Sequence, residues 1–378
     1  MNAIYLDHNA TSPLDPRVLD AMMPFLTERY GNPSSMHGFG GSVARDIERA
    51  RQSVARLIGA DHDYEIVFTA TGTESDNMAI QGALAYYRDR RHVITSRVEH
   101  PAVLSLCKKL EKEGYRVTYV PVDSQGNIDM NVLKEAVDDD TAIVSIMYAN
   151  NETGVIQPLR EISAICREHR VLLHTDAAQT VGKIGTFVDE LGVDLLSVAG
   201  HKLYAPKGIG ALYVRRGVRL DPVLHGAGHE AGLRPGTENV PSIVGLGQAC
   251  TLAFRSLEES AHKLESLRDR LLAQLSEAIG ERLTVNGRKA PRLPNTLSVN
   301  FPEVAAVDMI ARLPELCVST GSACHSGVPG MSPTLAAMGL DPDVARGTVR
   351  ISVGWFTSEE EIDRAASLLI GAWESLTR

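Results

Sequence analysis

Short apolar runs rich in β-branched residues alternate with amphipathic helical patterns along most of this 378-residue chain. Two of the runs, 142–147 and 171–175, are almost continuously apolar, which is typical of parallel strands buried on both faces. A helical pattern at 159–169 lies between them. Further strands are expected at 65–69, 92–96 and 116–120. This alternation predicts an α/β fold in which helices cover a mainly parallel sheet.

The pattern changes near residue 255, where a long, charged, leucine-rich helix is predicted to run to Gly280. Beyond it we expect strands at 295–301 and 349–353 and a closing helix from Ser358. A chain of this length suggests two domains, at about 100–200 residues each. We therefore expect a large domain at 13–256 and a smaller α+β domain at 257–378, to which residues 1–12 return.

Charge and cysteine content exclude several classes of protein. The 38 basic residues against 47 acidic ones give a net charge of −9, and no basic stripe stands out, so we expect no nucleic-acid partner. The first eleven residues do not form a secretion signal, and the apolar run 142–149 is too short to cross a membrane. Five cysteines without a CxxC pair predict neither a disulfide framework nor a metal site. We therefore expect a cytoplasmic protein.

Residues 68–77 end a strand, turn at a glycine and begin a helix with hydroxyl and acidic side chains. The free N–H groups and the dipole at the start of a helix suit a phosphate. Alternatively, Thr73 is a plain N-cap without any ligand. This segment alone leaves both interpretations open.

Asp176 and Lys202 are each predicted just past the C-terminal end of a buried strand, which is where open α/β sheets place their ligands. Pyridoxal phosphate needs this combination of residues. The carboxylate keeps the ring nitrogen protonated, and the lysine forms a Schiff base with the cofactor. The alternative is a buried ion pair, which is costly to desolvate.

Further segments make a resemblance specific: 5–11, 31–33, 72–77, 98–100, 150–154, 174–176, 200–202, 234–239 and 320–324. With these segments in this order, the chain resembles the pyridoxal-phosphate-dependent cysteine desulfurases of the NifS/IscS type, within the class V aminotransferases. The resemblance implies the aspartate-aminotransferase-like fold of pyridoxal-phosphate-dependent transferases. In that fold the large domain holds a mainly parallel, seven-stranded sheet and the small domain is α+β.

The resemblance also implies which residues bind the cofactor. Lys202 holds it covalently, Asp176 pairs with the ring nitrogen, and His100 stacks on the ring and shuttles protons. Other positions match residues at the ring hydroxyl (Gln179, Asn151) and around the phosphate (Gly72, Thr73, His201).

Other positions match residues that bind substrate or a second subunit. Asn32 and Arg350 match the groups that bind the substrate carboxylate, and a guanidinium fork suits a carboxylate by its geometry. Asn151 matches a residue that also orients the substrate. Thr237 matches a residue that reaches the phosphate across a dimer interface, which implies a homodimer. One departure from the family is Ala199, where a serine often contacts the phosphate, so one hydrogen bond to the cofactor is expected to be missing.

Cys324 lies in the glycine-rich stretch 319–330, which predicts an exposed loop. A thiol in such a loop can ionise and attack, whereas a core thiol cannot. The resemblance makes Cys324 the nucleophile. The other cysteines fit core positions in helices or a strand: Cys107, Cys166, Cys250 and Cys317.

The resemblance implies conversion of L-cysteine to L-alanine, with Lys202 moving the Cα proton. The sulfur remains on Cys324 as a persulfide and then passes to an acceptor, such as an iron–sulfur scaffold protein or a carrier for thio-cofactors. Segments 323–326, 234–239 and 343–346 also resemble selenocysteine lyase, which is the first alternative. The others are a class V enzyme that forms no persulfide, and a relative that only binds partners or carries sulfur.

Overall fold

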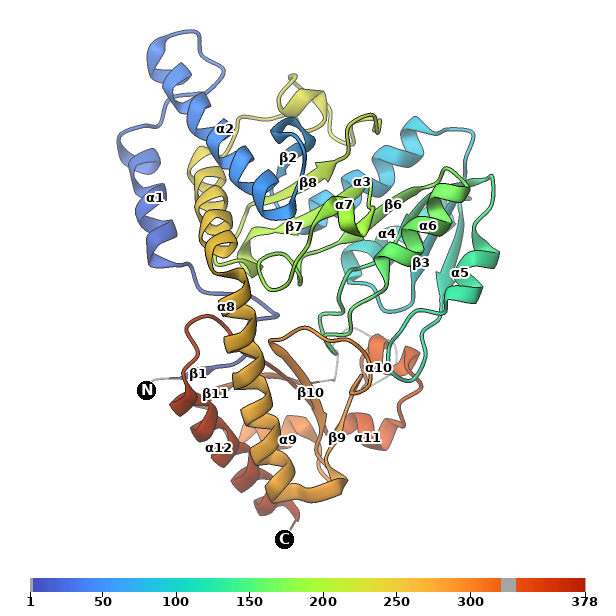
Figure 1. Ribbon diagram of the computed structural model, residues 1–378, viewed down its shortest axis with the longest axis vertical. Coiled ribbons are helices and arrows are strands. Elements are labelled where there is room, and N and C mark those ends of the chain that lie inside the picture. The colour runs from blue at the N-terminus through green and yellow to red at the C-terminus, as the bar shows by residue number, and fades with distance from the viewer. Residues whose placement is uncertain (1–2, 321–330, 378) are drawn as a thin grey trace.

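The computed structural model describes residues 3–320 and 331–377, and a seven-stranded sheet lies at the centre of its upper part (Figure 1). The strand order is β2-β8-β7-β6-β5-β3-β4. The bounds are Ile66–Thr69 (β2), His92–Ser96 (β3), Arg116–Val120 (β4), Thr141–Ser145 (β5), Leu172–Asp176 (β6), Leu195–Ala199 (β7) and Gly210–Val214 (β8). Of these seven strands, β8 alone runs antiparallel to its neighbours. The predicted α/β class with a mainly parallel sheet is confirmed.

Helices cover both faces of this sheet because its strands are apolar on both sides. In β2, Ile66 and Phe68 join one buried cluster, while Val67 between them joins the cluster on the other face. The second cluster contains α3 (Gly72–Tyr86) and α4 (Pro101–Lys112). The first contains α1 (Pro16–Thr27), α2 (Gly38–Ile58), α5 (Met130–Ala136), α6 (Leu159–Glu168) and α7 (Val188–Leu191).

A second buried core lies in the lower part of Figure 1. Its antiparallel sheet has the order β12-β13-β10-β9, and a short parallel pair, β1 with β11, packs beside it. The strands are β1 (Ile4–Tyr5), β9 (Thr284–Val285), β10 (Thr296–Asn300), β11 (Leu316–Cys317), β12 (Ser319–Thr320) and β13 (Thr348–Ser352). The helices are α9 (Ala306–Ala311), α10 (Pro333–Ala337), α11 (Pro342–Arg346) and α12 (Glu359–Thr377). Ile4 and Leu6 belong to this core, so the first residues of the chain pack with its last third.

Helix α8 (Val240–Ile279) passes from the upper core into the lower one (Figure 1). The predicted start near residue 255 was wrong by fifteen residues, because Gly245 and Gly247 weaken the helical pattern there. Gly247 is needed for packing. A Cβ at that position would lie 2.6 Å from the Cα of Ala50, so α8 and α2 touch backbone to backbone.

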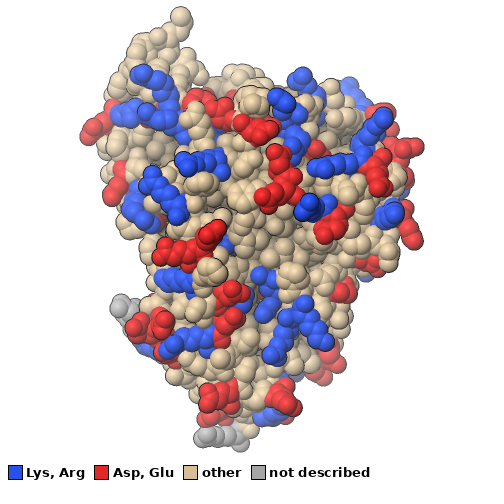
Figure 2. Space-filling view, in the orientation of Figure 1, with Lys and Arg blue, Asp and Glu red and all other residues tan. Residues whose placement is uncertain are grey.

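The outer surface carries charges of both signs. Figure 2 shows Lys and Arg side chains interspersed with Asp and Glu over the face drawn, without a large area of one sign among its described residues. No described helix combines the length and the apolar composition that crossing a bilayer requires.

Candidate active site

Asp176 and Lys202 end neighbouring parallel strands and line one cavity of about 480 Å³. Asp176 is the last residue of β6, and Lys202 closes the short 3₁₀ turn Gly200–Lys202 that follows β7. The cavity therefore lies at the carboxyl edge of the sheet, as the sequence predicted.

Most of the cofactor residues implied by the resemblance line this same cavity: Gly72, Thr73, His100, Asn151, Asp176, Gln179, His201 and Lys202. They come from the start of α3, the start of α4 and the turns after β5, β6 and β7. Ala199 lines the cavity as well. Asn32, Thr237 and Arg350 are not among its lining residues.

The amine of Lys202 is held by backbone carbonyl groups of the N-terminal segment. Its Nζ donates to the carbonyl oxygen of Ala10 at 2.9 Å and also to that of Asn9. The pKa of Lys202 is lowered to about 8, mainly by burial and then by the charge of Arg350, against the opposing charge of Asp176. At pH 7 roughly a tenth of this amine is therefore uncharged, far more than in an ordinary lysine, and nucleophilic attack on a carbonyl requires the uncharged form.

Asp176 is fixed by its own turn, since its Oδ1 accepts a hydrogen bond of 2.9 Å from the backbone N–H of Ala178. Two other buried acids lie close to it. Burial raises the pKa of Glu99 to about 8, and burial followed by the charge of Asp176 raises that of Asp76 well above its usual range. Asp76 lines the cavity, and its Oδ1 has no hydrogen-bond partner among the described residues. Burial and the neighbouring charge of Asp176 therefore both favour the protonated form of the Asp76 carboxyl group.

Helix α3 begins at Gly72, and Thr71 is its N-cap, with its side-chain oxygen accepting from the Glu74 N–H at 3.0 Å. The assignment of Thr73 as the N-cap was therefore wrong. Thr73 and Gly72 occupy the first turn, whose N–H groups have no partner within the helix. A Cβ at Gly72 would lie 3.1 Å from that of Ala199, so the two backbones approach closely at this wall. This turn can accept an anion.

Two histidines border the cavity. The Nδ1 of His100 accepts from the Ala102 N–H at 3.2 Å, which leaves Nε2 as its protonated nitrogen when the ring is neutral. The pKa of His100 is lowered, mainly because protein shields the ring from water, while Asp176 opposes this and Lys202 adds to it. His201 lies 3.2 Å from the hydroxyl of Thr11, and burial lowers its pKa to about 4.

Arg350, on β13, lies close to the cavity and is already engaged. Its Nη2 donates to Asp7 Oδ1 at 2.6 Å and to Ser319 Oγ at 3.0 Å, and its Nη1 donates to the Asn151 carbonyl oxygen at 3.2 Å. Its Nε is buried and has no partner in the described part of the chain. Through Asn151, which does line the cavity, this guanidinium is connected to the site.

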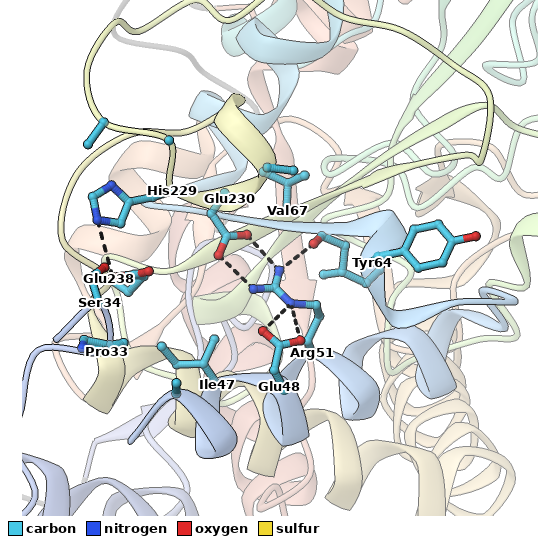
Figure 3. A pocket seen from close by; sticks show the side chains of 15 residues that line it. Pro33, Ser34, Ile47, Glu48, Arg51, Tyr64, Val67, His229, Glu230 and Glu238 are labelled. Carbon is cyan, nitrogen blue, oxygen red and sulfur yellow. Dashed lines mark hydrogen bonds and ion pairs between the residues drawn. The ribbon is translucent and has the colours of Figure 1, made fainter. Parts of the chain in front are cut away.

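Asn32 and Thr237 lie apart from Lys202. Asn32 is exposed, and its Oδ1 accepts from the Ser34 N–H at 2.9 Å, whereas Thr237 lines a separate cavity of about 150 Å³. Beside Asn32, a larger cavity of about 690 Å³ opens between α2 and the segment 227–238 (Figure 3). Figure 3 shows Arg51 among the side chains that line this cavity, paired with Glu230 and with Glu48.

Sequence reasoning missed three residues that hold the site together: Asp7, Asn9 and Lys183. Asp7 and Asn9 belong to the segment 5–11 that carried the resemblance, but no role was derived for them. Lys183 gave no signal, because one lysine in a turn cannot be recognised as buried from its sequence position.

Cys324 lies outside the described residues. Among the other cysteines, Cys107, Cys166 and Cys250 are buried, as predicted, whereas Cys317 is half-buried, contrary to the expected core position. Cys317 belongs to the two-residue strand β11, which lies too near the surface to cover it fully. Burial raises the pKa of Cys107 and of Cys166 to about 12, so both stay protonated and unreactive.

A mainly parallel sheet with a second core, and a lysine and a carboxylate beyond adjacent strands, define the class of pyridoxal-phosphate-dependent transferases. The chain belongs to the family Aminotransferase class-V, which it matches over residues 4–365. This family uses pyridoxal phosphate.

Individual relatives cover nearly the whole chain. A cysteine desulfurase from Nostoc sp. is 48% identical over 371 residues, which are 98% of this chain and 92% of that protein. A solved NifS-like protein superimposes with a TM-score of 0.90 at 40% identity, covering 99% of both chains. A third, described as SspA in complex with cysteine, has a TM-score of 0.82 at 37% identity and covers 92% of this chain and 98% of its own.

Proposed function

We propose that this protein is a pyridoxal-phosphate-dependent cysteine desulfurase that converts L-cysteine to L-alanine and transfers the sulfur, as a persulfide on Cys324, to an acceptor. The observation that carries the proposal is the single cavity that joins Lys202, Asp176 and the first turn of α3. The named relatives are cysteine desulfurases at 44–48% identity, which favours this activity over selenocysteine lyase.

The polar groups around the cavity fit pyridoxal phosphate one by one. The depressed pKa of Lys202 suits covalent attachment, Asp176 offers a carboxylate for the ring nitrogen, and the turn at Gly72 and Thr73 offers N–H groups to the phosphate. His201 would lie beside the phosphate, His100 against the ring, and Gln179 with Asn151 at the ring hydroxyl. When bound, the cofactor withdraws electrons from the substrate Cα and weakens its bonds.

Residues of the chain would bind the substrate, move the Cα proton and accept the sulfur. Arg350 and Asn32 would bind the substrate carboxylate, and Asn151 would orient the substrate. Lys202, once released, would take the Cα proton, and its lowered pKa leaves a free amine for this step. The Cys324 thiolate would attack the substrate sulfur. The S–S bond forms as the C–S bond breaks, and the electron pair of that bond stays on Cβ, which is then protonated to give alanine.

We propose further that the protein is a cytoplasmic homodimer in which Thr237 of one copy reaches the phosphate of the other. Thr237 is exposed and lies outside the Lys202 cavity of its own chain, which supports this arrangement. A mixture of Lys202→Ala and Thr237→Ala protomers tests it. In a dimer with one protomer of each kind, one of the two sites contains both Lys202 and Thr237. This hybrid should therefore bind more cofactor than either variant dimer alone.

We also propose that the chain forms two domains. The large one spans residues 13–256, and the small one combines residues 1–12 with 257–378. This division is supported by the buried clusters, since Ala253 belongs to the upper core whereas Leu264, Ile4 and Leu6 belong to the lower one. The acceptor is proposed to be a protein thiol that serves iron–sulfur cluster or thio-cofactor assembly.

The first test is the absorbance spectrum, followed by product analysis. We expect a band near 420 nm (roughly that of a protonated lysine linkage to pyridoxal phosphate) and, with L-cysteine and a thiol reductant, alanine and sulfide in equal amounts. Cys324→Ser should keep the absorbance band and form neither alanine nor sulfide, while the control variant Cys317→Ser should keep the band and form both products. A protein that stays colourless with added cofactor would refute the Lys202 assignment and revive a role in binding alone. Sulfide and alanine from Cys324→Ser would instead favour a class V enzyme that forms no persulfide. The turnover of L-selenocysteine relative to that of L-cysteine distinguishes a selenocysteine lyase from a cysteine desulfurase.

A further inference from the structure

A second buried lysine lies behind the Lys202 cavity. Lys183 is 6% exposed, and no carboxylate of the described residues lies within ion-pair distance of its Nζ. Burial lowers the pKa of Lys183 well below its usual range, and the charges of Lys202 and Arg350 lower it further. A buried amine without an acid is costly, so its hydrogen bonds need an explanation.

The Nζ of Lys183 donates to two side-chain carbonyl oxygens. One is Oε1 of Gln179, at 2.9 Å, and the other is Oδ1 of Asn9, at 3.4 Å. A lysine amine has enough hydrogens for both bonds whether it is charged or neutral. Both amides therefore turn their oxygen toward Lys183.

The orientation of Asn9 is supported independently. Its Oδ1 also accepts from Asn295 Nδ2 at 2.9 Å, and its Nδ2 donates to Thr296 Oγ1 at 2.8 Å and to the Asn151 carbonyl oxygen at 3.1 Å. Rotating this amide by half a turn would break three hydrogen bonds in a buried place. Asn9 thus supplies one acceptor for the Lys183 amine, and the Gln179 oxygen supplies the other.

With its oxygen on Lys183, Gln179 must turn its nitrogen the opposite way. That nitrogen donates to the Asn9 carbonyl oxygen at 3.0 Å, the same oxygen that Lys202 contacts, and Gln179 lines the cavity. The Gln179 amide therefore presents its N–H₂ group as a donor on the side where Lys202 lies. A rotated amide would present a lone pair there and would repel an anionic oxygen.

We propose that Lys183 is a positioning residue that locks the Gln179 amide with its N–H₂ toward the cavity, so that the site stabilises an anionic ring oxygen of the cofactor next to Lys202. This inference rests on the proposed function, because it takes pyridoxal phosphate as the ligand. Lys183 touches neither the cavity nor the ligand and acts only through Gln179.

The test is a pH titration of the visible absorbance of the cofactor-loaded protein without substrate. In Lys183→Met the Gln179 oxygen loses its donor, so only the bond from Nε2 to the Asn9 carbonyl oxygen still opposes rotation of the amide. A rotated amide withdraws its donor from the ring oxygen, which then holds the linkage proton more tightly. The midpoint of the titration should rise by about one pH unit, the value expected for loss of one hydrogen bond to an anion. Lys183→Gln, which has a similar length and keeps a donor, should stay within a few tenths of the wild-type midpoint.

Gln179→Ala is the background that separates positioning from charge. There, adding Lys183→Met should move the midpoint no further, because the amide that it orients is gone. An equal shift in both backgrounds would overturn the proposal in favour of a direct electrostatic effect, and an unmoved midpoint in Lys183→Met would overturn it as well. If Lys183→Met binds no cofactor, Lys183→Gln decides: a normal midpoint upholds the donor role, and failure to bind refutes it. A protein that shows these midpoints but releases no sulfide from L-cysteine would refute the proposed function alone.

Discussion

The Arg51–Glu230 pair is a buried electrostatic contact away from the Lys202 cavity and suits a stability experiment (Figure 3). Arg51, on α2, binds both oxygens of Glu230 at 2.8 and 2.9 Å, and their side chains are only 10% and 4% exposed. The carboxylate also accepts from the Phe68 N–H at 2.7 Å, while Arg51 donates to the Ile66 carbonyl oxygen at 2.6 Å. The pair therefore fastens α2 and the segment around Glu230 to strand β2.

Glu230→Gln keeps the shape of the side chain but removes the buried charge opposite Arg51, whose remaining acidic partner is the exposed Glu48 at 3.2 Å. Removing one partner of a buried pair costs about 3–5 kcal/mol in free energy of unfolding, whereas an exposed pair is worth about 0–1 kcal/mol. Glu113→Gln makes the same chemical change in the exposed pair with Lys109, whose N–O distance is 3.0 Å. Urea unfolding of the cofactor-free protein, at one protein concentration, measures both variants.

The double variant Arg51→Met, Glu230→Met gives the sharper comparison. Replacing both partners by apolar side chains removes the unpaired charge, so it should recover most of the stability that Glu230→Gln loses. The reasoning would be refuted if Glu230→Gln lost no more than Glu113→Gln. It would also be refuted if the double variant were less stable than Glu230→Gln, since packing rather than charge would then dominate.

Four further predictions concern the cavity. Ala199→Ser should tighten cofactor binding about tenfold by adding one hydrogen bond to the phosphate; equilibrium dialysis measures it, and unchanged affinity would contradict the assigned place of the phosphate. Arg350→Gln should raise KM for L-cysteine about 100-fold through the loss of a charged, two-pronged contact; an unaltered KM would remove Arg350 from the substrate site. Because the pKa of Lys202 is lowered to about 8, the rate at which cofactor-free protein captures pyridoxal phosphate should rise with pH and level off above that value. A rate still rising at about pH 10, as an ordinary lysine would give, would disprove the lowered pKa. The pKa of Asp76 is raised, so its ionisation opposes folding, and stability should fall as the pH rises above the unfolded value, about 3.9. Asp76→Asn should flatten that part of the unfolding profile and keep the cofactor spectrum, and a steeper profile would contradict the raised pKa of Asp76.

Local sequence patterns were sufficient for the elements that carry the site. The continuous apolar runs of β5 and β6 could be recognised because strands buried on both faces need no polar alternation. Asp176 and Lys202 could then be placed at one edge, since parallel strands end together. The start of the long helix α8 was missed because Gly245 packs against Met22 of α1 and Gly247 packs against Ala50 of α2. These tertiary contacts cannot be recognised from the sequence alone.

The network behind the cavity could not be predicted, because its members have no regular spacing. Asn9, Lys183 and Asn295 meet from three distant parts of the sequence, and each is an unremarkable polar residue where it stands. Polar residues outside regular elements are mostly exposed, so the reasonable expectation for Lys183 was a solvated side chain. Only the return of the first residues to the lower core brings Asn9 to the sheet edge.

That return gives the site a dependence on both hydrophobic cores. Leu6 is packed in the lower core, and three residues later the carbonyl oxygen of Asn9 accepts from Lys202 and from Gln179, which belong to the upper sheet. Arg350 repeats the connection in the opposite direction, since it lies on the lower sheet and binds Asp7 and the Asn151 carbonyl oxygen. Each core thus supplies partners for side chains based on the other. A shift of one core against the other would release the Lys202 amine and the Arg350 guanidinium together, because residues 7–10 hold both.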